Sequence, residues 1–436
     1  MLMKVFERYF SRNPVSRQLS FEADTAVIVI IPVFNDPDIF ATLDSLCCCS
    51  VMNIKAGVLI VVNHSEVCPQ EIKTRNIGLS DTLKRYVRDR QTDRLRFEVV
   101  EAFDLPAKYA GVGLARKIAM DLSAAFFYRN GRIDAPILSL DADTWVEPNY
   151  LEEVVRYFQE KSVAGVSIAY AHRLEEAGMT VQAREAIMKY ELYLRYYRLA
   201  LEYTGHPHAY HCIGSAFAVR TLDYVAQGGM NKRQAGEDFY FLQKLIATGR
   251  YATLQSTQVY PSPRFSGRTP FGTGQAVRQI VQESGHFRVY HPQAFRDLKC
   301  FFQGISTLYK VDEAGVSGYF QQQTKDIRLF LSQMNGIAVL AEINANCASV
   351  EQFMKRFFDN FNAFRVLKYL NFVHESCYSK IDILSAANKL LAELNLPVAE
   401  SLECALQIFR KLFREAWKKR GREAGIDIRR YIFVSK

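Results

Sequence analysis

Long apolar runs are missing from this sequence. No stretch of its 436 residues approaches the roughly 20 apolar residues that a membrane-spanning helix needs. The first ten residues also lack the apolar core of a secretory signal peptide. These absences argue against a protein embedded in the membrane by helices and against a secretory leader. We therefore expect the protein to be made and kept in the cytoplasm.

Cysteine is present without the spacings that would give it a structural role. Three of the nine cysteines are adjacent (Cys47, Cys48 and Cys49), and no Cys-x-x-Cys pair occurs anywhere in the chain. Neither a disulfide framework nor a zinc site is indicated. We expect the cysteines to be small, mostly buried side chains in a reducing compartment.

The complete phosphate-binding glycine motifs are also missing. The stretch Gly111-Val-Gly-Leu-Ala-Arg116-Lys117 resembles a phosphate-cradling turn that opens a helix, but a full Gly-x-Gly-x-x-Gly is absent. No Gly-Lys-Ser/Thr of the Walker type occurs either. Taken alone, this glycine-rich turn is a weak signal.

The formal net charge of +9 is concentrated at the two ends of the chain. Residues 1–20 carry a net charge of +3 and residues 410–436 a net charge of +7, so the remaining chain sums to −1. Aromatic residues accompany both basic ends, which suits an anionic membrane surface at least as well as nucleic acid. No nucleic-acid-binding module is present, so we expect no nucleic-acid partner. The alternative is that both ends are ordinary solvated helix faces.

Strand and helix patterns alternate over most of the chain. Continuous β-branched runs such as residues 25–33 and 55–62 are typical of strands that are buried on both faces of a parallel sheet. The alternation predicts an α/β fold with a mostly parallel sheet and helices on both faces. After about residue 290 the pattern becomes helical only, with helices expected over residues 298–309, 325–345, 350–370, 381–394 and 399–420.

This change of pattern divides the chain into three predicted parts. They are a basic N-terminal arm (1–24), an α/β domain (25–290) and an all-helical C-terminal domain (291–436). The C-terminal helices would position an acceptor or attach the protein to the inner face of the membrane through residues 410–430. The alternative role is a helical cap that completes the core or forms a homodimer.

Two carboxylates end the strand that begins at Ile137. Asp141 and Asp143 lie two residues apart, so they would leave the same face of an ideal strand, while a turn would let them fan around one cation. Oxygen ligands of this kind suit Mg²⁺ or Mn²⁺, with phosphate oxygens completing the shell. The alternative is that they cap the helix that begins near Pro148.

A second acid pair, Glu237 and Asp238, opens an amphipathic helix about a hundred residues later. The helix dipole favours carboxylates in a first turn, so helix capping is again the alternative role. Asn35 and Asn63 follow two of the predicted strands, where open α/β sheets bind ligands in the crevice at the strand ends.

The order of these motifs resembles the family 2 glycosyltransferases of the GT-A fold, a Rossmann-like architecture. The resemblance rests on Pro-Val-Phe-Asn-Asp after the first strand, the Gly-x-Ala-Arg helix, Asp-Ala-Asp, Gly-Ser-Ala-Phe-Ala-Val-Arg and Gly-Glu-Asp-Phe. It covers residues 25–279 and leaves the C-terminal third unaccounted for. It implies an inverting enzyme that moves a sugar from a nucleotide-diphosphate donor to a hydroxyl acceptor.

The family's functional residues carry over to matching positions. The resemblance implies that Asp143 and Asp141 hold Mn²⁺ or Mg²⁺, that Asp238 is the catalytic base and that Glu237 accompanies it in the catalytic pair. The nucleotide-sugar site that it implies comprises Pro32, Val33, Asn35, Asn63, Arg116, Asp141, Ala142, Asp143, Gly214 and Arg278. The glycine-rich segment 264–274 is expected to be a mobile lid over the phosphates.

Two departures from the family pattern limit the prediction. The Gln-x-x-Arg-Trp signature of processive members is Gln275-Ala-Val-Arg278-Gln279 here, which argues against processive polymer synthesis. The sequence has Asn63-His64-Ser65 where relatives usually carry an acid that recognises the base, so the identity of the base is left open.

The predicted function is metal-dependent glycosyl transfer, with cell-surface glycan synthesis as one setting. The acceptor would be a glycan, a lipid-linked sugar or a small molecule. The alternatives are a nucleotidyltransferase and a non-catalytic nucleotide-sugar-binding protein.

Overall fold

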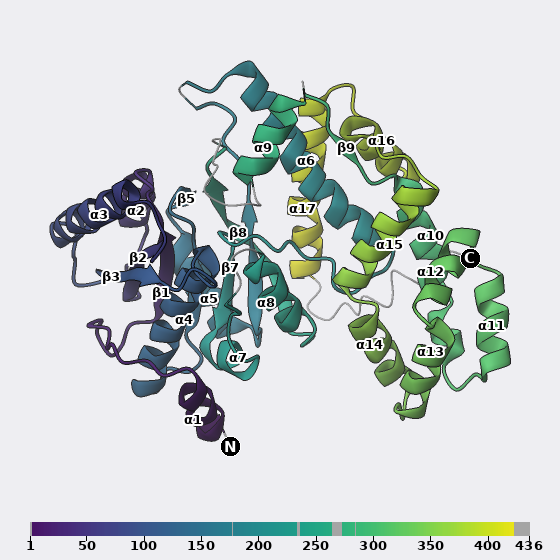
Figure 1. Cartoon of the computed structure of the whole chain (residues 1–436), viewed down its shortest axis with the longest axis horizontal. Helices are drawn as coiled ribbons and strands as arrows, with labels where there is room; N and C mark the ends of the chain where they lie inside the picture. The colour runs from purple at the N-terminus through teal and green to yellow at the C-terminus, as the bar shows by residue number, and fades with distance from the viewer. Residues whose placement is uncertain (1, 177, 233–235, 264–272, 284, 423–436) are drawn as a thin grey trace. The chain divides into compact units, whose positions relative to one another are not determined.

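The computed structural model describes residues 2–176, 178–232, 236–263, 273–283 and 285–422 (Figure 1). The chain forms two compact units. The first consists of Met1–Met179 and Tyr210–Ala276, and the second of Thr180–Ala209 and Val277–Lys436. This confirms the predicted α/β architecture with a helical C-terminal region. The predicted domain boundaries at residues 24 and 290 stay predictions.

An eight-stranded sheet forms the centre of the first unit, in the order β3-β2-β1-β4-β7-β6-β8-β5. The strands are β1 (Val27–Val33), β2 (Ala56–Ser65), β3 (Leu95–Leu105), β4 (Pro136–Ser139), β5 (Thr144–Val146), β6 (Gly165–Tyr170), β7 (Phe217–Arg220) and β8 (Tyr251–Pro261). The β1–β2, β1–β4, β2–β3 and β6–β8 pairs are parallel, and β7 and β5 pair with antiparallel neighbours. The sheet is therefore mostly parallel.

Helices cover both faces of this sheet. They are α1 (Leu2–Arg12), α2 (Ile39–Cys47), α3 (Gln70–Arg88), α4 (Val112–Arg129), α5 (Tyr150–Glu160), α7 (Thr221–Ala226) and α8 (Glu237–Ile246). Every residue of β1 is buried. Ile28 and Ile30 share a core cluster with Ala119 of α4, while the intervening residues of β1 point to the opposite face. The run of β-branched residues is thus explained by burial on both sides.

Pro32 lies within β1 without breaking the sheet. The carbonyl of Ile30 accepts a hydrogen bond from the Leu140 N–H at 3.1 Å, so even-numbered residues of β1 direct their backbone groups toward β4. Pairing with β4 ends at Ile30 and Ser139. The missing N–H of Pro32 therefore faces a position beyond the end of β4, where no ladder hydrogen bond is required.

Helix α1 packs into the core of the first unit. Phe6 is fully buried and stacks on Tyr128 at 4.7 Å between ring centroids. The Tyr9 hydroxyl donates to Asp121 at 2.6 Å, and Lys117 contacts the same carboxylate at 2.8 Å. The first residues predicted as a basic arm are therefore anchored by apolar and polar contacts, and only the opposite face of the helix carries exposed charge.

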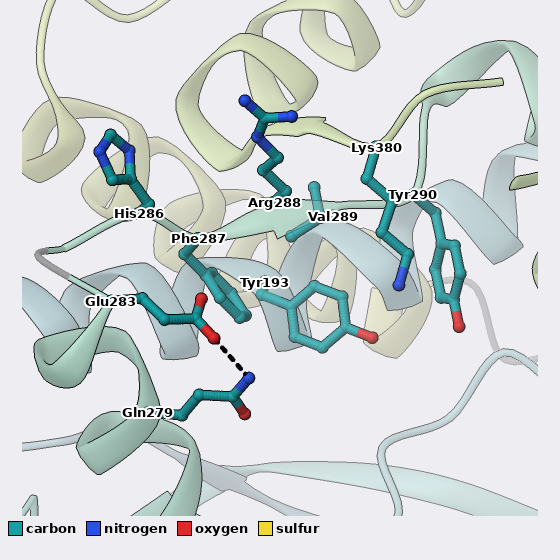
Figure 2. Close-up of a pocket in the computed structure, with 9 residues that line it drawn as sticks. All are labelled: Tyr193, Gln279, Glu283, His286, Phe287, Arg288, Val289, Tyr290 and Lys380. Atoms are coloured by element: carbon teal, nitrogen blue, oxygen red, sulfur yellow. Dashed lines mark hydrogen bonds between the residues drawn. The ribbon is translucent and has the colours of Figure 1, made fainter.

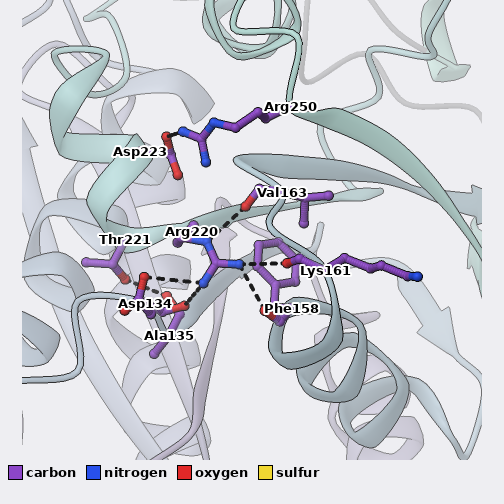
Figure 3. Close-up of polar contacts among 9 residues, drawn as sticks. All are labelled: Asp134, Ala135, Phe158, Lys161, Val163, Arg220, Thr221, Asp223 and Arg250. Carbon is purple, nitrogen blue, oxygen red and sulfur yellow. Dashed lines mark hydrogen bonds and ion pairs between the residues drawn. The ribbon is translucent and has the colours of Figure 1, made fainter. Parts of the chain in front are cut away.

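Arg220, the last residue of β7, ties three segments of the first unit together (Figure 3). Its guanidinium donates to the carbonyl oxygens of Val163 and Phe158, each at 2.9 Å. It also donates to the carbonyls of Lys161 and Asp134, each at 3.1 Å. The side chain thus satisfies carbonyls at the C-terminal end of α5 and carbonyls that precede β4 and β6.

Replacing Arg220 with Met is expected to lower the free energy of unfolding by about 3 kcal/mol or more. Each buried carbonyl left without a donor costs roughly 1–3 kcal/mol, and water can reach only part of this site. Urea unfolding would measure the loss. The matched control is Arg129→Met on the exposed surface of α4, and an equal loss in the two variants would contradict this role for Arg220.

The second unit is mainly helical. It contains α6 (Val181–Tyr203), the part of α9 (Thr273–Gln282) from Val277 onward, α10 (Pro292–Gln303), a 3-10 helix (Ile305–Leu308), α11 (Glu313–Gln321), α12 (Lys325–Gln333), α13 (Gly336–Ala345), α14 (Val350–Asn360), α15 (Ala363–Ser376), α16 (Ile383–Glu393) and α17 (Leu402–Arg422). Strands β9 (Arg288–Val289) and β10 (Ile381–Asp382) form one short antiparallel pair, so the region is helical but not all-helical. In the part of the chain that the structure describes, no helix is long and apolar enough to cross a membrane.

Two helices predicted in this region are each broken into a pair. The predicted helix 325–345 was wrong because Asn335 adopts a left-handed conformation (φ 53°) between α12 and α13. The predicted helix 350–370 was wrong because Asn362 starts a new helix, accepting hydrogen bonds from the Phe364 and Arg365 N–H groups. Asparagine suits both positions, since it tolerates left-handed geometry and caps helices.

Candidate active site

Polar residues gather where the parallel strands of the first unit end. Asn35 follows β1, Asn63 lies near the end of β2 and Asp141 follows β4. The chain passes from β1 through α2 to β2 on one side, and from β3 through α4 to β4 on the other. The β1–β4 boundary is therefore a topological switch point, the usual place for a ligand in an open α/β sheet.

Asp141 to Asp143 form a tight turn between β4 and β5. The Thr144 N–H donates to the Asp141 carbonyl at 3.2 Å, and the Thr42 hydroxyl donates to the Ala142 carbonyl at 2.8 Å. The Asp143 carbonyl accepts from the N–H of Ser262 at 3.0 Å. The next helix, α5, begins at Tyr150 and its N-cap residue is Asn149, so neither aspartate caps it. The capping alternative for this pair was wrong.

Arg116 on α4 joins the two acid pairs. Its Nη2 lies 2.6 Å from Asp141 Oδ1, and its Nη1 forms an ion pair with Glu237. The Arg116 and Glu237 side chains are nearly inaccessible to solvent, whereas 38% of the Asp141 side chain is exposed. A single buried guanidinium therefore bridges an acid at the end of β4 and an acid at the start of α8.

Gly214 is packed against this cluster. A Cβ atom at position 214 would lie 2.8 Å from Arg116 Nη2 and 3.0 Å from Asp238 Oδ2. Asp238 therefore lies beside the same guanidinium, and any side chain at position 214 would displace one of the two groups. Asp238 Oδ1 accepts from the Phe239 N–H at 2.7 Å, within the first turn of α8. Asp238 therefore both stabilises the first turn of α8 and belongs to the cluster around Arg116.

Three carboxylates, Asp141, Glu237 and Asp238, surround one guanidinium, so negative charge is in excess when all are ionised. Burial raises the pKa of Glu237 to about 7, with Arg116 opposing the shift and Asp238 adding to it. Burial likewise raises the pKa of Asp238 against the pull of Arg116. Burial lowers the pKa of Arg116, but the three carboxylates outweigh it and the pKa is raised. The cluster is therefore poised to hold a proton or a further cation.

The raised pKa of Glu237 predicts how stability depends on pH. The folded protein holds this proton more tightly than the unfolded chain, whose glutamates titrate near 4.5. The raised pKa of Glu237 therefore contributes fully to the free energy of unfolding below pH 4.5. This contribution is lost as the pH rises through about 7. A Glu237→Gln variant cannot ionise at this position. Its melting temperature relative to the wild type is expected to rise by about 2 °C or more between pH 5 and pH 8.

Differential scanning calorimetry at the two pH values measures this change. The control is Glu160→Gln, which removes an exposed carboxylate at the end of α5. A difference between the Glu237 variant and the wild type that stays constant with pH would contradict the proposed linkage.

A second polar group lies at the ends of β1 and β2. The Asn63 amide donates to the Val33 carbonyl at 2.8 Å. Asn76 on α3 donates to the Asn63 carbonyl at 3.0 Å and accepts from the Asn35 N–H at 2.8 Å. Asn35 itself adopts a left-handed conformation with φ 44°. Asn76 thereby links the loop after β1 to the end of β2.

Asn76 was not predicted from the sequence. A signal was available, because Asn76, Ser80, Leu83 and Val87 form the buried face of α3 at helical spacing. An amide on such a face requires hydrogen-bond partners, so it marks a polar contact within the core.

The predicted site residues thus fall into groups. Arg116, Asp141, Glu237, Asp238 and Gly214 come together, and Val33, Asn35 and Asn63 share the asparagine network. Arg278 is an exposed residue of α9 in the second unit, and its place in the site stays a prediction. Most of the predicted lid, residues 264–272, lies outside the described residues.

The acid pair after β4 fits a hard divalent cation by the chemistry of its donors. Asp141 uses one oxygen to bind Arg116 and is partly exposed, and Asp143 is half-buried. Among the described residues, no group of three or more metal-binding side chains is arranged to hold an ion. The protein would therefore supply one or two carboxylates, which is common for Mg²⁺ when phosphate oxygens complete the shell.

Comparisons with known proteins give only a distant likeness. No protein-family model matches the chain, and no match was found among curated proteins. Among solved structures, the chain is similar to S. aureus TarS 1-349 in complex with UDP-GlcNAc. The two are 13% identical with a TM-score of 0.38, over 78% of this chain and 92% of that one.

GalNAc-T7 with UDP, GalNAc and Mn²⁺ is a second similar structure. It is 12% identical with a TM-score of 0.34, over 79% of this chain and 59% of that one. Both neighbours are glycosyltransferases crystallised with a UDP compound. At TM-scores of 0.34 to 0.38, the likeness is too distant to say what this chain binds.

Proposed function

We propose that this chain is a glycosyltransferase that moves a sugar from a nucleotide-diphosphate donor to a hydroxyl group. The observation that carries the proposal is the position of Arg116, which brings Asp141 and the Glu237–Asp238 pair together at the carboxyl edge of the sheet. Two acid pairs about a hundred residues apart in sequence become one site. The proposal includes three more specific statements: the chain belongs to family 2, the donor carries a hexosyl group, and the anomeric carbon is inverted.

In the proposed reaction, the acceptor hydroxyl attacks the anomeric carbon while Asp238 takes up its proton. A base works best when its pKa approaches the working pH, and burial moves the pKa of Asp238 in that direction. Glu237 holds Arg116 in place by an ion pair, so that the guanidinium stays between the two acid pairs. Inversion follows if the hydroxyl enters opposite the departing phosphate.

The donor would lie along the strand ends, with its nucleoside near Pro32, Val33, Asn35 and Asn63. The amide of Asn63 is engaged with Val33, so Asn63 would act by shaping the pocket as well as by direct contact with a base. Asp141 and Asp143 would hold Mn²⁺ or Mg²⁺, which stabilises the negative charge of the departing diphosphate. The exposed part of Asp141 favours this role.

Three further properties remain proposals. They are contact with an anionic membrane through the basic ends of the chain, a cytoplasmic location and a homodimer formed by the C-terminal helices. In α1, Lys4 and Arg8 are exposed and would be the contact residues at the N-terminal end.

The proposal is tested by a thermal-shift screen of nucleotide sugars with and without Mn²⁺. A ligand that binds only the folded state raises the melting temperature by mass action. One class of nucleotide sugar is expected to stabilise the protein, and more strongly with Mn²⁺ than without it. The Asp143→Asn variant is expected to lose the Mn²⁺ effect, while Asp93→Asn, at a fully exposed position, retains it. No shift with any nucleotide sugar would contradict the proposal.

A further inference from the structure

A cavity of about 390 Å³ lies within the second unit, apart from the residues of the acid cluster (Figure 2). Its volume falls in the range of small-molecule sites. The residues that line it come from α6, from α9 and β9 together with residues that follow each of them, and from the segment that precedes β10. Neither the predicted site nor the proposed reaction uses the aromatic wall of this cavity, its end with Glu283 or its end with Lys380.

Aromatic side chains form one wall of the cavity. The Tyr193 and Phe287 rings lie 5.5 Å apart and perpendicular to each other. Tyr290 continues this wall, and its hydroxyl is fixed by a 2.7 Å hydrogen bond to Asn371. The negative face of an aromatic ring attracts the weakly positive C–H groups on the face of a sugar ring. This wall therefore suits a carbohydrate.

The two ends of the cavity differ in chemistry. On α9, the Gln279 amide donates to one Glu283 oxygen at 2.8 Å, which leaves the second oxygen as an acceptor for hydroxyl groups. Figure 2 shows Lys380 on the other side of the Tyr193 ring. Pairing of Val289 with Ile381 holds Lys380 beside Tyr290, with its ammonium 5.1 Å from the ring centroid.

The cationic end has no internal counter-charge. In the described part of the chain, neither Lys380 nor Arg288 has a carboxylate within ion-pair distance. The single acid of the lining, Glu283, is engaged by Gln279 at the opposite end. The local charge therefore favours a ligand that carries a negative group at the Lys380 end.

We propose that this cavity binds a sugar ring that bears an anionic group, of which a sugar phosphate is the simplest example. The sugar ring lies against the aromatic wall, its hydroxyl groups face Glu283, and its anionic group contacts Lys380. Binding does not depend on the transfer reaction. The further statement that such a sugar belongs to the acceptor rests on the proposed function.

Isothermal titration calorimetry without any nucleotide sugar tests the site, with glucose 6-phosphate, glucose and inorganic phosphate as probes. The wild type is expected to bind glucose 6-phosphate at least tenfold more tightly than glucose or phosphate. Lys380→Gln is expected to lower the affinity for glucose 6-phosphate about tenfold, and Tyr193→Ala to lower the affinities for glucose and its phosphate together. Lys368→Gln, an equal charge change on the exposed face of α15, is the control and keeps wild-type affinity.

Three results would overturn the proposal: no saturable binding of glucose 6-phosphate, phosphate alone binding as tightly as the sugar phosphate, or unchanged binding by Lys380→Gln. If Tyr193→Ala does not fold, Gln279→Ala replaces it, because Gln279 is exposed on α9. That variant is expected to weaken both sugars and not phosphate, and unchanged sugar binding would count against the site. Failure here leaves the nucleotide-sugar shifts unaffected, so the two proposals fail separately.

Discussion

Replacing Asp238 with Asn is expected to reduce sugar transfer by a factor on the order of 10² to 10⁴, the usual contribution of a positioned general base. Asparagine preserves the shape of the side chain and its contact with the first turn of α8 but cannot take up the proton of an acceptor hydroxyl. Nucleotide binding is expected to stay within about twofold of the wild type, because the residues proposed to bind the nucleoside lie at the ends of β1 and β2, whereas Asp238 is on α8.

The measurement pairs initial rates of transfer with a titration of the nucleoside diphosphate. Asp93→Asn is the matched control, since its side chain is fully exposed. The pH profile separates a chemical role from a structural one. The wild-type rate should rise with pH as Asp238 ionises, and the residual rate of the variant should lack this step. Undiminished turnover by Asp238→Asn would refute the assignment of the base.

Removing the charge of Arg116 is expected to have the largest effect on stability. In an Arg116→Met variant, Asp141, Glu237 and Asp238 would lose the cation that they share. Breaking a buried ion pair from one side costs about 3–5 kcal/mol because an uncompensated charge remains. The loss should be largest at pH 8 and smaller at pH 5, where Glu237 takes up a proton.

Urea unfolding of three variants tests this expectation. Arg116→Lys keeps the charge but not the fork that reaches two carboxylates, so it should fall between the wild type and Arg116→Met. Arg156→Met is the control, because Arg156 is half exposed and also pairs with two carboxylates on its own helix. An exposed pair of this kind contributes roughly 0–1 kcal/mol. Equal losses at positions 116 and 156 would contradict the central role of Arg116.

The sequence predicted those parts of the fold in which local pattern and burial agree. The β-branched run at Val27–Val33 is buried on both faces, as its pattern indicated. Strand β8 (Tyr251–Pro261) was not predicted, because polar residues interrupt its apolar ones and no clear alternation results. Helix α1 was interpreted as a basic arm because charge alone does not indicate that Phe6 and Tyr9 are buried.

The residues of the candidate site were named from the sequence, whereas the contacts between them were not. Both acid pairs and Arg116 were named from their motifs. Arg116 and Glu237 are separated by 121 positions, however, and no pattern in the sequence indicates their ion pair. The same holds for Asn76, whose two partners lie after β1 and near the end of β2. Such contacts depend on the order of strands in the sheet, which local patterns do not determine.

The acid cluster around Arg116 is proposed to serve glycosyl transfer from a nucleotide sugar. The most direct measurement is product analysis after incubation of the protein with nucleotide sugars and Mn²⁺. The account predicts release of a nucleoside diphosphate, loss of that release with a chelator, and its loss in Asp238→Asn when an acceptor is supplied. Formation of a nucleoside triphosphate from added pyrophosphate would instead indicate a nucleotidyltransferase. Tight binding of a nucleotide sugar without any turnover would indicate a binding protein, and either result would contradict the account.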